Sequence, residues 1–129
     1  MGPARSAGVY FRQARVRKVG SLNYRKAARY VPVAAVADVP PGTMRTVEVD
    51  DWRIVVVNVD GEFFAYDSQC PHLGGPLDKG RLDDGALVCP WHGWRFDART
   101  GRPIWPQGVW KATRFPVAVE DGQVLVRVA

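Results

Sequence analysis

The sequence predicts an all-β fold, and three observations support this prediction. From Tyr30 onward, short valine-rich runs alternate with turns made of glycine, proline and aspartate, a pattern typical of the strands and tight turns of small β domains. Segments with the apolar spacing of a helix are nearly absent from the same region. The chain has 129 residues, the size of one domain with its own core, so we expect a single folded domain.

The first four expected strands lie in the first half of the chain, and each ends at a turn signal. Proline and glycine close the first strand, two aspartates close the second, and Asp60-Gly61 is a hairpin signal after the third. The third strand is the most strongly β-branched of the four. The expected ranges are Tyr30–Val36, Thr43–Val49, Trp52–Val59 and Glu62–Tyr66.

Three further strands are expected in the second half. The turn Asp83-Asp84-Gly85 leads into a short apolar strand, and Asp121-Gly122 joins two longer strands into a closing hairpin. Residues 102–108 are rich in proline and tryptophan and are expected to form a loop. The expected strands are Ala86–Val88, Thr113–Glu120 and Gln123–Val128, and the predicted core includes Val47, Val55, Val57, Phe63 and Val124.

The net charge of +5 comes from the first 29 residues. Residues 1–29 hold eight basic and no acidic side chains, which leaves ten basic and thirteen acidic side chains in residues 30–129. We expect 1–29 to be a flexible basic arm; an organelle transit peptide is less expected because serine is scarce and glycine interrupts the helical period. The folded part is mildly acidic, so we expect no nucleic-acid partner.

The apolar segments of the chain are short. No run approaches the roughly 18 consecutive apolar residues of a membrane-spanning helix. We therefore expect a soluble, cytoplasmic protein without a membrane anchor.

Cysteine and histidine occur only twice each, in two short motifs. These are Cys70-Pro71-His72 and Cys89-Pro90-Trp91-His92, each just beyond an expected strand. Thiolate and imidazole are both good metal ligands, so this arrangement indicates a metal site. Proline after each cysteine and glycine close behind suit loops whose backbone approaches a cofactor. The candidate ligands are Cys70, His72, Cys89 and His92, and no residue is assigned a catalytic role.

Two other readings of these residues stay open. Structural zinc also uses two cysteines and two histidines, although zinc fingers usually separate a cysteine pair from a histidine pair, whereas each motif here mixes the two. Such a zinc-stabilised interaction module would bind an acidic partner through the basic arm. A disulfide between Cys70 and Cys89 is the other possibility, but the chain shows no signal peptide, which favours a reducing compartment.

The motifs and their flanking residues resemble the Rieske family of iron–sulfur proteins. The resemblance depends on Cys70-Pro-His-Leu-Gly-Gly-Pro-Leu and Cys89-Pro-Trp-His-Gly-Trp-Arg-Phe-Asp, and it extends over residues 30–129. It implies antiparallel sheets and a small cluster-binding subdomain, at about 67–108, built from two loops. It also implies one [2Fe-2S] cluster per chain, with one iron held by the two cysteines and the other by the two histidines.

The resemblance implies electron transfer rather than catalysis. With all four side chains on the irons, no coordination position is open for substrate or oxygen. In this family the exposed imidazole edges are where electrons leave, which implies His72 and His92. We therefore expect a monomeric one-electron carrier between a flavoprotein reductase and a terminal oxygenase. The small electron-transfer subunit of another oxidoreductase, such as nitrite reductase, is the alternative.

The residues around the motifs imply a low reduction potential. High-potential members of the family have a disulfide between the loops and hydroxyl groups that donate to sulfur, which stabilises the more negative reduced cluster. Here Gly75 and Trp91 stand at the disulfide positions, Trp94 at the serine and Phe96 at the tyrosine. The expected midpoint is therefore at the low end of the family's range, about −150 mV.

Other residues near the motifs receive structural readings. We expect the tryptophans to shield the site or fill the core rather than stack on nucleic-acid bases; they are Trp91, Trp94, Trp105 and Trp110. Asp67 and Asp78, which flank the first motif, are expected to be solvated or to form turns, and they are assigned no role.

Overall fold

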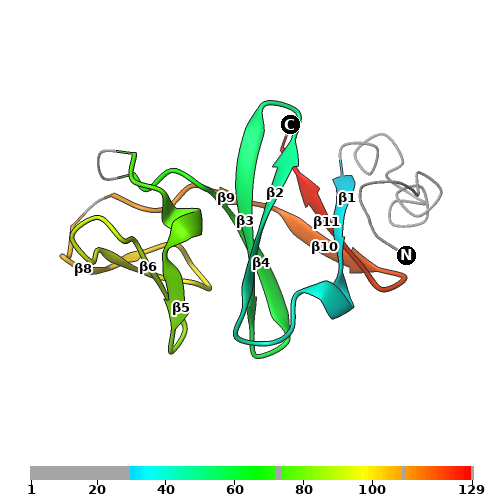
Figure 1. Ribbon diagram of the computed structural model, residues 1–129, viewed down its shortest axis with the longest axis horizontal. Helices are drawn as coiled ribbons and strands as arrows, with labels where there is room; N and C mark the ends of the chain where they lie inside the picture. The colour runs from blue at the N-terminus through cyan, green and yellow to red at the C-terminus, as the bar shows by residue number, and fades with distance from the viewer. Residues whose placement is uncertain (1–29, 72–73, 109, 129) are drawn as a thin grey trace.

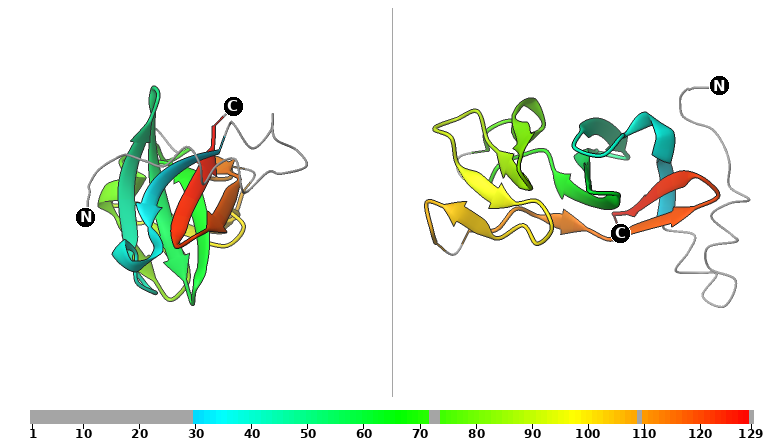
Figure 2. Two further views of the ribbon diagram at one scale, coloured as in Figure 1. Left: turned by 90° about the vertical axis from the view of Figure 1, so that its right-hand side faces the viewer. Right: turned by 90° about the horizontal axis from the view of Figure 1, so that it is seen from below.

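The computed structural model describes residues 30–71, 74–108 and 110–128. These residues form three antiparallel sheets that lie side by side (Figure 1), and the turned views agree with this arrangement (Figure 2). The prediction of an all-β fold is confirmed. The predicted basic arm, 1–29, lies outside the described residues. No helix among the described residues is long and apolar enough to cross a membrane.

The three sheets contain strands that are distant in sequence. The first sheet has the order β1 (Tyr30–Ala35), β11 (Gln123–Arg127) and β10 (Val117–Glu120). The central sheet has the order β2 (Met44–Val49), β3 (Trp52–Val59), β4 (Glu62–Asp67) and β9 (Arg114–Phe115). The third sheet is a meander of β5 (Arg81–Asp83), β6 (Ala86–Val88), β7 (Arg95–Asp97) and β8 (Pro103–Trp105). Two 3-10 turns, η2 (Val36–Asp38) and η3 (Leu77–Lys79), complete the described elements.

Strand β3 is buried on both faces because it lies between two cores. Val55 and Val57 pack in the cluster that fills the space toward the third sheet. The alternate residues, Ile54 and Val56, pack with Val124 of β11 in a second cluster toward the first sheet. A strand with two buried faces requires a continuous apolar run rather than an alternating one, which is what residues 54–57 provide.

The predicted core is largely correct. Val55, Val57 and Val124 are fully buried, whereas Val47 and Phe63 are partly buried at the margin of the second cluster.

Two expectations about the second half of the chain are wrong. The single strand expected over 113–120 is broken at Pro116, because β9 pairs with β4 and β10 pairs with β11. Proline has no N–H for a ladder hydrogen bond, and the chain changes sheets at this residue. The expected loop 102–108 contains the short strand β8, which pairs with β7.

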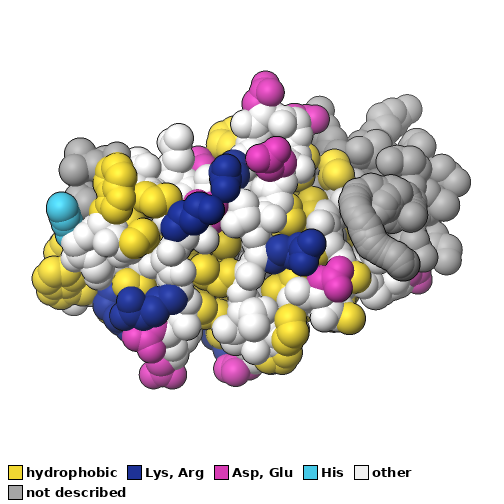
Figure 3. All heavy atoms as spheres, viewed as in Figure 1, with side chains coloured by type: hydrophobic (Ala, Val, Ile, Leu, Met, Phe, Trp, Pro, Cys, Tyr) yellow, Lys and Arg dark blue, Asp and Glu magenta, His cyan; other side chains and the backbone are white. Residues whose placement is uncertain are grey.

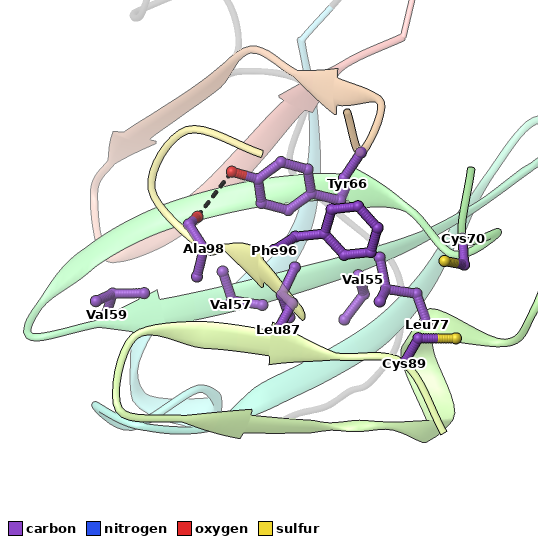
Figure 4. Packing of buried hydrophobic residues seen from close by; sticks show 11 residues of the cluster. Val55, Val57, Val59, Tyr66, Cys70, Leu77, Leu87, Cys89, Phe96 and Ala98 are labelled. Atoms are coloured by element: carbon purple, nitrogen blue, oxygen red, sulfur yellow. Dashed lines mark hydrogen bonds between the residues drawn. The ribbon is translucent and has the colours of Figure 1, made fainter. Parts of the chain in front are cut away.

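One tyrosine joins the central and third sheets through the core. Tyr66 of β4 is fully buried beside Phe96 of β7, and its hydroxyl donates to the Ala98 carbonyl at 2.7 Å (Figure 4). Burial raises the pKa of Tyr66 to about 12, with a smaller raising effect from Asp97 and a lowering one from Arg114. The third sheet is thereby fixed against the central one.

Candidate metal centre

The first cysteine lies in a closed loop that follows β4. The Cys70 N–H donates to the Gly75 carbonyl at 2.7 Å, and the Gly74 N–H donates to the Cys70 carbonyl at 3.0 Å. Gly74 has a φ of 71°, in the left-handed region that glycine adopts without strain. Cys70 is only 1% exposed, so the loop carries its sulfur into the interior.

The second cysteine directly follows β6. The Cys89 N–H donates to the Trp94 carbonyl at 2.7 Å, which closes the second loop. His92 and Gly93 both have positive φ, 68° and 71°, so the chain reverses within two residues. Histidine is among the residues that tolerate this region. The loop buries Cys89 completely and leaves His92 exposed.

The two loops touch where Gly75 meets the second loop. A Cβ at Gly75 would lie 2.9 Å from Cys89 Sγ and 3.0 Å from Trp91 Cδ2. The backbone of the first loop therefore lies directly against the sulfur of the second, a position that only glycine fits. Gly75 and Trp91, placed by the resemblance at the positions of the inter-loop disulfide, are indeed neighbours across the loops.

The structure brings both cysteines to one end of the same core cluster (Figure 4). Both carry thiols rather than a disulfide. His92 is exposed in the loop that joins β6 to β7 of the third sheet, and Figure 3 shows hydrophobic side chains gathered at the end of the molecule that the third sheet forms. His72 lies outside the described residues, so its place in the site stays a prediction.

The donor set is the one that the family resemblance assigns to a two-iron cluster. The implied ligand set gives each iron of a two-iron cluster only two protein ligands. Two buried sulfurs from opposed loops, walled by Leu77, Leu87 and Phe96, provide the apolar surroundings in which such a cluster is held.

The tryptophans near the loops are more exposed than expected. Trp94 is half-buried and stacks on Trp110, with ring centroids 5.8 Å apart and an interplanar angle of 22°. Trp91, Trp105 and Trp110 have exposed fractions of 46%, 56% and 50%. These three contribute to a surface rather than to the core. A groove of about 250 Å³ runs beside the stacked pair, lined by Trp94, Pro103, Pro106, Gln107, Gly108 and Trp110.

Sequence reasoning missed the role of Asp78. Its side chain is only 4% exposed and forms an ion pair with Arg53, with Nε and Oδ2 3.1 Å apart. The expectation of a solvated side chain is therefore wrong, whereas the place of Asp78 in the 3-10 turn η3 agrees with the expectation of a turn-forming residue. The two residues are 25 positions apart, and no local pattern links them, because the contact depends on how η3 packs against the central sheet.

Comparison with known proteins identifies the family of this chain. The family model of the Rieske [2Fe-2S] domain matches residues 29–116, a range that contains both loops and all four candidate ligands. The chain belongs to the Rieske [2Fe-2S] family. Membership in this family implies a [2Fe-2S] cluster.

Two relatives within the Rieske family are ferredoxins of oxygenase systems. The ferredoxin component of the alkene monooxygenase system of Xanthobacter autotrophicus is 40% identical over 75% of this chain and 80% of its own length. The ferredoxin subunit of 3-phenylpropionate/cinnamic acid dioxygenase from Photorhabdus laumondii is 36% identical over 75% of this chain and 92% of its own.

A solved Rieske structure agrees with these relatives. The structure described as a complex of reduced oxygenase and oxidized ferredoxin in carbazole 1,9a-dioxygenase contains a chain that matches with a TM-score of 0.70 and 35% identity, over 77% of this chain and 93% of that one. The predictions of a Rieske-type ferredoxin, and of an electron carrier rather than a catalyst, are confirmed.

Proposed function

We propose that Cys70, His72, Cys89 and His92 hold one [2Fe-2S] cluster, through which this chain passes single electrons to a terminal oxygenase. The observation that supports this assignment most strongly is the contact of the two loops at Gly75, which places the first loop against the Cys89 sulfur. When bound, the cluster supplies a centre that accepts and releases one electron.

The proposed centre has a buried side, formed by the two cysteines, and an exposed side, formed by histidine. Cys70 and Cys89 are 1% and 0% exposed, so the sulfur side faces the protein core and excludes water. His92 is exposed in the loop between β6 and β7 of the third sheet. The imidazole side is therefore the short route from the cluster to a partner, and we assign electron exit to His92.

The partner is a protein of an oxygenase system. The carbazole 1,9a-dioxygenase ferredoxin, which is 35% identical, is described in complex with its oxygenase, and this likeness supports a terminal oxygenase as the acceptor here. We assign the electron donor to a flavoprotein reductase. All four candidate ligands come from one chain, which supports a complete site in a monomer. We assign the protein to the cytoplasm.

Chemical analysis of the purified protein tests this proposal. Anaerobically purified protein should be red-brown, bleach with dithionite, and contain about two irons and two acid-labile sulfides per chain. Changing Cys89 to Ser should remove the colour, whereas changing Asp38, an exposed residue on the far side of the fold, to Asn should leave it. A colourless protein with zinc and no sulfide would contradict the proposal and support the interaction module.

A further inference from the structure

One residue of the central sheet holds the first loop at both ends. At the start of the loop, the Ser68 N–H donates to the Arg53 carbonyl at 2.9 Å. At its end, the Arg53 Nε donates to the Asp78 Oδ2 at 3.1 Å. The backbone and the side chain of Arg53 therefore bracket residues 68–78, the segment that carries Cys70.

The Asp78 side chain is shielded from solvent and has a second donor. The Thr46 hydroxyl of β2 donates to the same carboxylate oxygen at 3.2 Å. The Asp78 side chain is 4% exposed, whereas the Arg53 side chain is 50% exposed. A carboxylate this deeply buried needs both partners, because desolvation penalises an unpaired charge.

Between these two ends the loop is a closed unit. The Leu77 N–H donates to the Ser68 carbonyl at 2.7 Å, which draws the two sides of the loop together at its neck. The orientation of this unit on the sheet therefore depends on its attachments at Ser68 and Asp78. Gly75, which lies against Cys89 Sγ, belongs to the same unit, so a shift at Asp78 moves the contact between the two loops.

We propose that Arg53, through its contact with Asp78, is a positioning residue that sets the geometry of the metal centre. This inference rests on the proposed function, because the quantity that Arg53 controls is the placement of Cys70 relative to Cys89. Breaking the Arg53–Asp78 ion pair lets the first loop tilt relative to the sheet. The tilt exposes the cluster to solvent and changes the arrangement of the ligands around its irons. The fold itself retains its cores, since neither Arg53 nor Asp78 belongs to them.

The test follows cluster loss from the holoprotein in the presence of an iron chelator, by the fall in visible absorbance. Arg53→Met and Asp78→Asn should each accelerate the loss about tenfold, the size of effect that outer partners of metal ligands have. The double variant should be no faster than the faster single variant, because both changes remove one contact. Arg53→Lys, which keeps the charge, should restore part of the retention.

The matched control is Arg99, which lies just after β7 and forms ion pairs with the central sheet region. It contacts Asp60 and Glu62 in the β3–β4 hairpin, away from the first loop. Arg99→Met should change the rate of cluster loss by less than about twofold, because exposed pairs contribute little. The electron paramagnetic resonance g-values of the reduced cluster should shift in the Arg53 and Asp78 variants only; a purely stabilising role would leave them unchanged.

The role of Arg53 would be overturned if Arg53→Met and Asp78→Asn both lose the cluster at the wild-type rate and keep the wild-type g-values. With a normal cluster in the wild type, that result would leave the proposed function standing. A wild-type protein without a cluster would overturn both. If Arg53→Met does not fold, Asp78→Asn decides, because it removes the same ion pair from the other side and nearly keeps the shape of the side chain. Faster cluster loss with shifted g-values in Asp78→Asn supports the proposal, and a wild-type rate contradicts it.

Discussion

At the scale of single residues, Tyr66 fixes the position of the third sheet, and with it the second loop. Its ring is fully buried and its hydroxyl reaches the carbonyl of Ala98, just beyond β7. A hydrogen bond inside an apolar core contributes mainly because its loss leaves a polar group unsatisfied. The sequence showed an aromatic residue in a strand but not this partner, which lies 32 positions away.

Replacing Tyr66 by Phe should destabilise the protein. The substitution leaves the buried Ala98 carbonyl without its donor, which costs about 1–3 kcal/mol. Thermal unfolding of the holoprotein should therefore begin several degrees lower, by about 4–8 °C for each kcal/mol lost. An unchanged unfolding temperature would contradict the role of this hydrogen bond.

The same tyrosine should make stability depend on alkaline pH. Its pKa is raised from 10.0 to about 12 in the fold by burial, so ionisation favours the unfolded chain. The stabilising contribution is complete below pH 10 and is lost as the pH rises toward 12, on the order of 2–3 kcal/mol in total. The measurement is the difference in unfolding free energy between wild type and Tyr66→Phe across this range. A difference that stays constant would contradict the prediction.

Two side chains near the loops bear on the reduction potential. Trp94 and Phe96 stand where the resemblance places the hydroxyl donors of high-potential proteins. Neither side chain has a hydroxyl to donate to a cluster sulfur, and Phe96 is fully buried. The midpoint should therefore lie near the low end of the family's range, about −150 mV. Protein-film voltammetry measures it directly, and a midpoint above zero would refute this account.

At the scale of elements, the strands with turn signals on both sides were predicted best. The range Trp52–Val59 agrees with β3, and Ala86–Val88 agrees with β6. The short strands β5, β7 and β8 were not predicted, because three residues carry no periodicity. The equally short β6 was predicted because a turn signal precedes its apolar run and a cysteine motif follows it. The break at Pro116 was missed because valine and alanine continue beyond it, and only the sheet topology shows the change of partner.

The packing of the two loops gives a prediction at this scale. A methyl group added at Gly75 would meet Cys89 Sγ at 2.9 Å and the Trp91 ring at 3.0 Å, so Gly75→Ala must push the loops apart. We expect substoichiometric iron and faster bleaching in air. Gly108→Ala is the control, because a Cβ there meets nothing within 4 Å. Equal iron content in both variants would contradict the inferred contact.

At the scale of the whole molecule, the three sheets place the metal centre at one end. The first sheet lies at the opposite end, with the central sheet between them (Figure 1). The segments 70–76, 89–94 and 103–110, which carry the motifs and the exposed tryptophans, contain no charged residue. The two loops that carry Cys70 and Cys89 could be predicted from the sequence, and the ligand roles of the two cysteines and two histidines stay a prediction. This surface and the Arg53–Asp78 contact required the tertiary structure.

Docking of the oxygenase on the uncharged segments 70–76, 89–94 and 103–110 predicts how electron transfer responds to salt. Since Coulomb attraction between exposed charges is screened by salt, electron transfer to the oxygenase should change little between about 0.05 and 0.5 M salt. Trp105→Ala should slow the transfer about tenfold by removing an apolar contact, whereas Trp52→Ala, in the central sheet and 39% exposed, should not. A steep fall in rate with salt would contradict this assignment.

The electron paramagnetic resonance spectrum of the dithionite-reduced protein tests the central claim most directly. An iron held by His72 and His92, linked through sulfide to an iron held by Cys70 and Cys89, predicts a [2Fe-2S] signal with the low average g-value of nitrogen-ligated ferrous iron. A spectrum without a signal, or one with the higher average g-value of an all-cysteine cluster, would contradict the mixed ligation on which this account depends.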